Sequence, residues 1–167
     1  MLKYIIKLLK ALNSNRHPGE IAHAVCCGLI LGFLPKTNLT WYIITFLFLF
    51  LRINKGTLTL LTLAFSFLAP VFDAAFDKLG YAILMWDPVS VFMANALEFP
   101  GFHFLKLNNT IVMGSLVSSI ILYLPVYGFS RLFIFVWRRY LVPALRKTKA
   151  VQVISKMKLV VKIKGLV

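Results

Sequence analysis

Two short apolar runs joined by a polar corner dominate the pattern of hydrophobic and polar positions along this chain. The runs cover residues 21–34 and 39–51, and between them lie Pro35, Lys36, Thr37 and Asn38. Helices of this length rise only about 20 Å at about 1.5 Å per residue, which is short of the roughly 30 Å hydrocarbon core of a bilayer. The pattern therefore predicts a helical hairpin over residues 18–52 that enters a membrane and turns back. The alternative is a hairpin that crosses twice by tilting and by thinning the bilayer.

The polar corner is the part of this hairpin whose backbone most needs to be shielded from lipid. Backbone N–H and C=O groups find no partners in lipid, so interrupted helices occur at membrane depth only where protein or water surrounds them. We therefore expect a homo-oligomer, or a helix of a partner, to cover the hairpin. The same reasoning predicts that the corner is the functional part of the chain.

A third apolar run covers residues 56–72, contains Pro70, and is just long enough to span a bilayer. Asp73 and Asp77 follow it, one helical turn apart. Residues 73–108 mix aromatic side chains, prolines and sparse charges, a combination typical of segments that rest at a membrane surface. We interpret residues 73–108 as a periplasmic interfacial segment.

Residues 110–130 form the clearest span, in which Gly114, Ser115, Ser118 and Ser119 offer a face for close helix packing. Residues 1–15 place lysines on one helical face and apolar side chains on the other, which predicts an amphipathic helix in the membrane surface. Residues 138–167 form a basic tail.

The expected fold is all-α: a polytopic membrane protein with an amphipathic N-terminal helix, a re-entrant or broken hairpin, two full spans and a basic tail. The membrane domain covers residues 16–137.

Composition supports this class and excludes others. Hydrophobic residues make up 60% of the chain and charged residues 14%, with a mean hydropathy of +0.84, whereas soluble domains carry roughly 25% charged residues. The net charge of +14 sits mainly at the chain ends and beside apolar runs, as in loops and tails that lie against an anionic leaflet. Nucleic acid is therefore not an expected partner. Cys26 and Cys27 are adjacent, without redox or zinc spacing, and we interpret them as small buried apolar side chains.

The distribution of charge also predicts the topology. Basic residues concentrate in residues 1–16, residues 52–55 and the tail, whereas residues 73–108 hold most of the acidic ones. By the positive-inside rule, both termini are cytoplasmic and residues 73–108 lie on the opposite side.

The same residues resemble a known family. The chain is similar to the bacterial membrane proteins catalogued as domain-of-unknown-function 2062, over roughly residues 16–81. The elements that carry the resemblance are Pro18, Ile21, Ala22, the small residues Ala24, Gly28 and Gly32, Leu34-Pro35, Leu51-Arg52-Ile53-Asn54, Pro70 and Gly80. Many members have Asn-Pro at the later corner, where this chain has Ala69-Pro70.

Some relatives in this family look fused to sugar-transferase domains. Another subset of the family is encoded beside large AsmA-like proteins, which resemble bridges that carry lipid across the periplasm. The resemblance therefore implies work on phospholipid in a bacterial inner membrane, with a large periplasmic AsmA-like lipid-transfer protein as partner.

Polar residues at the corners and helix ends are the candidate lipid- or partner-binding site. Lys36 and Arg52 suit a lipid phosphate, Arg as a two-pronged donor and Lys as a point charge. Both also suit simple anchoring at opposite membrane surfaces. Asp73 and Asp77 suit either a proton or cation site or a solvated helix end. The full candidate set is Pro35, Lys36, Asn38, Arg52, Asn54, Lys55, Pro70, Asp73 and Asp77.

The sequence contains no recognisable catalytic set, phosphate loop or metal-ligand spacing, so we expect neither an enzyme nor a cofactor or metal. Three functions remain. The first is a noncatalytic subunit that handles phospholipid and docks a bridge-like protein. The alternatives are a small ion or solute transporter or channel, and a structural membrane scaffold without a ligand.

Overall fold

The computed structural model describes residues 18–141, which are all helical apart from short connections. The α-helices are α2 (Pro18–Phe33), α3 (Leu39–Phe50), α4 (Lys55–Leu84), α5 (Asp87–Leu97) and α6 (Thr110–Val136). A 3-10 helix, η1 (Phe102–Leu105), precedes α6, and a π-helical turn, η2 (Trp137–Leu141), follows it. The predicted amphipathic helix at residues 1–15, and the basic tail from residue 142 on, lie outside the described residues.

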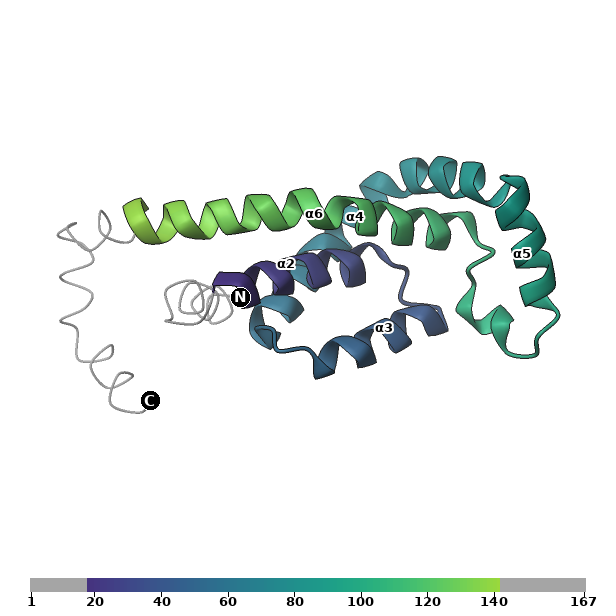
Figure 1. Ribbon diagram of the computed structural model, residues 1–167, viewed down its shortest axis with the longest axis horizontal. Helices are drawn as coiled ribbons and strands as arrows, with labels where there is room; N and C mark the ends of the chain where they lie inside the picture. The colour runs from purple at the N-terminus through teal and green to yellow at the C-terminus, as the bar shows by residue number, and fades with distance from the viewer. Residues whose placement is uncertain (1–17, 142–167) are drawn as a thin grey trace.

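The two helices of the predicted hairpin, α2 and α3, have the expected bounds. α2 begins at Pro18, whose fixed φ suits the first helical turn. α3 begins after Asn38, whose side chain accepts a hydrogen bond from the Trp41 N–H at 2.8 Å. Figure 1 shows α2 and α3 running in opposite directions from their shared corner. The chain thus forms two antiparallel helices joined at the corner. That this hairpin re-enters a membrane stays a prediction.

Helix α2 is the centre of the bundle. Every side chain from Ile21 to Leu34 is buried except His23 and Val25. α4 and α6 pack against α2 and against each other, while α3 lies on another side of α2 (Figure 1). Since the chain's own helices cover α2, burial of α2 does not require a second copy; oligomerisation stays a prediction.

Glycines set the closest contacts of α4 with its neighbours. A methyl group at Gly28 of α2 would lie 2.8 Å from Leu61 Cβ. Where α4 crosses α6, a methyl group at Gly80 would overlap the Thr110 carbonyl oxygen and lie 2.9 Å from the Gly114 nitrogen. The predicted packing face of α6 is confirmed at Gly114, which is buried in this crossing.

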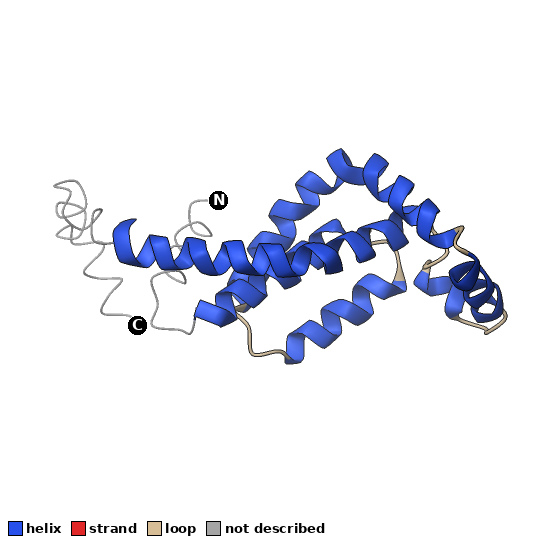
Figure 2. Cartoon of the chain, turned by 45° about the horizontal axis from the view of Figure 1, so that its top comes forward, coloured by secondary structure: helices blue, strands red, loops and turns tan. Residues whose placement is uncertain are grey.

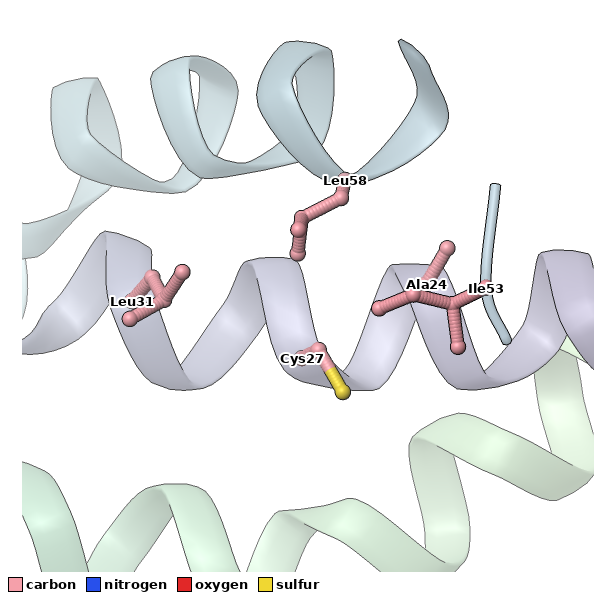
Figure 3. Close-up of a cluster of buried hydrophobic side chains, with 5 residues drawn as sticks. All are labelled: Ala24, Cys27, Leu31, Ile53 and Leu58. Carbon is pink, nitrogen blue, oxygen red and sulfur yellow. The ribbon is translucent and has the colours of Figure 1, made fainter. Parts of the chain in front are cut away.

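A cluster of buried side chains fastens the hairpin to α4. It consists of Ala24, Cys27 and Leu31 of α2, Ile53 from the connection, and Leu58 of α4 (Figure 3). Side chains of α3 pack against this cluster, among them Trp41, whose indole N–H donates to the Leu31 carbonyl oxygen at 2.9 Å. Cys26 and Cys27 are buried free thiols, as predicted.

Helix α4 does not end where the sequence pattern predicted. The expected span stopped at residue 72, but α4 continues through Pro70 to Leu84. Proline removes one backbone hydrogen bond and crowds the preceding turn, which kinks a helix without always ending it. Figure 2 shows α4 bending along its course. Asp73 and Asp77 therefore lie on the second half of α4 rather than beyond its end.

The outer surface of the bundle is strongly apolar. α4, and α6 together with most of η2, are long and apolar enough to cross a membrane, and only 6% and 28% of their most apolar windows are buried. Phe67, Val71 and Leu124 are 82%, 75% and 77% exposed. A core helix of a soluble protein would instead bury most of such a window, so this surface matches a lipid environment.

Candidate functional site

The corner between α2 and α3 is held by three contacts that fix its backbone. Asn38 is 2% exposed and caps α3. The Thr40 hydroxyl donates to the Leu105 carbonyl oxygen of η1 at 2.8 Å, and the Trp41 indole ties α3 back to α2. The corner is thus anchored to both neighbouring segments, so Lys36 extends from a fixed backbone.

A hollow of about 330 Å³ lies beside this corner, and we call it the corner hollow. It brings together two parts of the predicted site that are far apart in sequence, Pro35 with Lys36 and Pro70 with Asp73. Its remaining walls are Gly32, Phe33, Leu34, Ser66, Ala69 and Ile111. The two proline corners that the sequence marked therefore face the same space.

Two opposite charges share the corner hollow without neutralising each other. Lys36 is exposed and Asp73 is partly buried. Neither side chain makes a hydrogen bond or ion pair with another of the described residues. The Ser66 hydroxyl donates to the Thr62 carbonyl oxygen of its own helix at 2.6 Å. The hollow thus offers one cation and one anion on an otherwise largely apolar wall.

Three other residues of the predicted site have helix-capping contacts. Asn38 caps α3, and Asn54 caps α4 by accepting from the Thr57 N–H at 3.0 Å. Lys55 Nζ donates to the carbonyl oxygens of Phe48, Leu49 and Leu51, each at 2.8 Å. These contacts satisfy backbone groups that a helix end leaves unpaired. The Asn38 Nδ2 atom is buried and makes no hydrogen bond.

Lys36 and Arg52, the two cations that suit a lipid phosphate, do not lie together. The two residues lie beyond opposite ends of α3, which has 12 residues and so spans about 18 Å at about 1.5 Å per residue. Arg52 is exposed and follows the end of α3 that lies away from the corner. The last candidate, Asp77, accepts a hydrogen bond from the Thr110 hydroxyl at the start of α6. Asp77 is therefore engaged in joining α4 to α6.

Sequence reasoning missed a string of polar contacts between α2 and α6. His23 Nδ1 lies 2.6 Å from the Tyr123 hydroxyl, and its ring centroid lies 4.7 Å from that of Tyr127. Arg131 donates to the Tyr127 hydroxyl at 3.2 Å. The four-residue spacing of Tyr123, Tyr127 and Arg131 places them on one helix face, and this spacing was the available signal.

Within residues 18–141, no three His, Cys, Asp or Glu side chains are placed to hold a metal ion.

Comparison with protein families gives a match over most of the chain. Residues 1–141 match the family described as "Uncharacterized protein conserved in bacteria (DUF2062)". The chain belongs to the DUF2062 family. The match extends well beyond residues 16–81, where the resemblance was first noted, and takes in α5 and α6.

A relative of similar length is found by comparison with known proteins. An uncharacterized protein of Treponema pallidum (strain Nichols) is 32% identical over 145 residues, which cover 87% of this chain and 90% of the relative. No solved structure matches the chain.

Proposed function

We propose that this DUF2062 protein is a noncatalytic subunit of the bacterial inner membrane that binds phospholipid. In this proposal it passes lipid to a large periplasmic AsmA-like bridge protein for transport towards the outer membrane. The exposed apolar surface of α4 and α6 supports the membrane location. The corner hollow is the observation that carries the lipid-binding role.

The corner hollow suits a zwitterionic phospholipid headgroup. Lys36 supplies a cation for the phosphate, and Asp73 supplies a carboxylate for an amine such as that of phosphatidylethanolamine. Phe33, Leu34 and Ile111 provide apolar walls for the first part of an acyl chain. An ion path through Asp73 and Asp77 is less well supported, because Asp77 is bonded to Thr110.

The end of the bundle that carries the corner hollow also suits a docking partner. Four of the five acidic residues, Asp73, Asp77, Asp87 and Glu98, lie in the second half of α4 and in or just after α5. Exposed aromatic side chains gather in and around α5 and in η1, including Trp86, Phe92, Phe99 and Phe104. The arginines of α6 and η2 lie towards the other end of α6. By the positive-inside rule, this distribution supports a periplasmic position for the end with the corner hollow and a cytoplasmic one for both termini.

Photocrosslinking in living cells tests the proposal. A photoreactive residue at position 36 is expected to capture phospholipid or a large periplasmic protein, which mass spectrometry of the adduct identifies. The matched control carries the same probe at position 52, an exposed cationic position beyond the other end of α3. If position 36 yields only self-adducts, or none, the proposal fails and an oligomeric channel or scaffold is favoured.

Removing either charge of the corner hollow is expected to weaken binding of phosphatidylethanolamine. We expect Lys36→Gln and Asp73→Asn each to cost roughly tenfold in affinity, because a hydrogen bond to a charged group contributes about 1.5–3 kcal/mol. Titration of the purified protein with this lipid, followed by native mass spectrometry, measures the effect. Lys78→Gln on the exposed surface of α4 is the control and should bind as the parent does.

A further inference from the structure

Two adjoining hollows lie at the end of the bundle opposite the corner. The first, about 300 Å³, is lined by Arg131, Ile134, Phe135, Arg138 and Arg139, and we call it the arginine hollow. The second, about 290 Å³, is the apolar hollow between α2, α4 and α6. Its lining consists of Ile21, Val25, Thr57, Leu61, Phe129, Ser130, Phe133 and Ile134. Ile134 lines both, so a cationic space and an apolar space meet at one side chain.

The apolar hollow has one buried hydroxyl without a partner. Thr57 is only 2% exposed, and its Oγ1 makes no hydrogen bond. A buried hydroxyl is normally hydrogen-bonded, because leaving one unpaired costs free energy. An acceptor oxygen on a molecule that enters this hollow would satisfy it.

The arginine hollow is held open by aromatic side chains. The Arg131 guanidinium bonds the Tyr127 hydroxyl and lies 5.9 Å from the centroid of its ring. The Arg139 guanidinium lies 5.5 Å from the Phe135 ring centroid and 5.8 Å from that of Tyr140. Among the described residues, no acidic side chain pairs with Arg131 or Arg139. Guanidinium groups that have no acidic partner are suited to two-pronged binding of phosphate.

We infer that these two hollows together bind one anionic phospholipid. Its phosphate lies in the arginine hollow on Arg131, one acyl chain enters the apolar hollow past Ile134, and an ester carbonyl oxygen accepts a hydrogen bond from Thr57. The ligand is lipid rather than free phosphate because the arginine hollow opens beside a space with an apolar lining. The inference takes only the membrane location from the proposed function, and it concerns a different surface from the corner hollow.

Native mass spectrometry of the full chain in mild detergent tests the inference. The protein is delipidated and then mixed with phosphatidylglycerol or with phosphatidylcholine that carries the same acyl chains. We expect one phosphatidylglycerol to stay bound per chain under conditions that strip phosphatidylcholine. Equal retention of the two lipids would overturn the inference, because it would reduce the arginines to general surface anchors.

Two kinds of variant distinguish a specific lipid-binding site from general attraction of anionic lipid to the basic surface. Arg131→Gln should weaken phosphatidylglycerol binding roughly tenfold, the size of effect expected for a charge-assisted hydrogen bond. Val25→Phe adds bulk to the apolar hollow and should abolish one-to-one retention while leaving all arginines in place. Val91→Phe, at a position that is 60% exposed on α5, is the matched control. Unchanged retention in Val25→Phe would overturn the inference.

If Val25→Phe fails to fold, Thr57→Val tests the proposed lipid site instead. Valine has nearly the shape of threonine and removes only the unpaired hydroxyl, so the lipid-free protein should be at least as stable as the parent. Its binding of phosphatidylglycerol should nevertheless fall, and undiminished binding would contradict the site. Lys78→Gln, at an exposed position that lines neither the arginine hollow, the apolar hollow nor the corner hollow, should leave phosphatidylglycerol retention unchanged.

Discussion

Gly80→Ala is expected to destabilise the protein by at least about 2–3 kcal/mol, the cost of forcing atoms into a packed contact. The new methyl group would overlap the Thr110 carbonyl oxygen and lie 2.6 Å from the Thr110 carbonyl carbon. Both atoms belong to the backbone, so no side-chain rotation relieves the overlap. Unfolding in detergent micelles, followed by circular dichroism, measures the loss.

Gly128→Ala is the matched control, because it makes the same substitution within α6. A methyl group there meets nothing within 4 Å. Alanine is the better helix former, so this variant should be unchanged or more stable by up to about 1 kcal/mol. Equal destabilisation of the two variants would show that the α4–α6 crossing does not limit stability.

Lys55→Met is expected to lower the free energy of unfolding by about 2–4 kcal/mol, because several backbone carbonyl groups lose a charged donor. In the parent, Lys55 Nζ bonds the carbonyl oxygens of Phe48, Leu49 and Leu51 at the end of α3. The amides of the last turn of α3 should then exchange hydrogen faster. Hydrogen exchange followed by mass spectrometry measures this change.

The control for Lys55 is Lys78→Met, which removes an exposed lysine from the same helix. It should leave exchange in α3 as it was. Lys55→Arg should retain part of the protection, because a guanidinium also donates to carbonyl groups. If Lys55→Met left α3 fully protected, the capping role would be refuted.

The local structure of the hairpin was predictable because its signals are local. Pro18 opens α2, and Asn38 caps α3 through an atom only three residues away. The continuation of α4 past Pro70 was not predictable in this way. Whether a proline ends a helix or bends it depends on what the following turns pack against, and here Gly80 packs against α6.

The candidate site was predictable in its residue types and only partly in its arrangement. Proline corners and intramembrane charges identified Lys36 and Asp73, which do share the corner hollow. Lys36 and Arg52 are separated by the length of α3, and residue type alone does not show that separation. The capping role of Lys55 depends on how the connection after α3 folds back, and residue type alone carries no signal for that.

Helix α4 packs closely against its neighbours near both of its ends and contains a proline near its middle. The first close contact is that of Gly28 with Leu61, and the second is that of Gly80 with Thr110 and Gly114. Pro70 lies between them, and it lines the corner hollow. A change in the bend of α4 at Pro70 can therefore widen or narrow the corner hollow while both close contacts remain in place. The width of the corner hollow is then set by the bend of one helix rather than by the packing of the whole bundle.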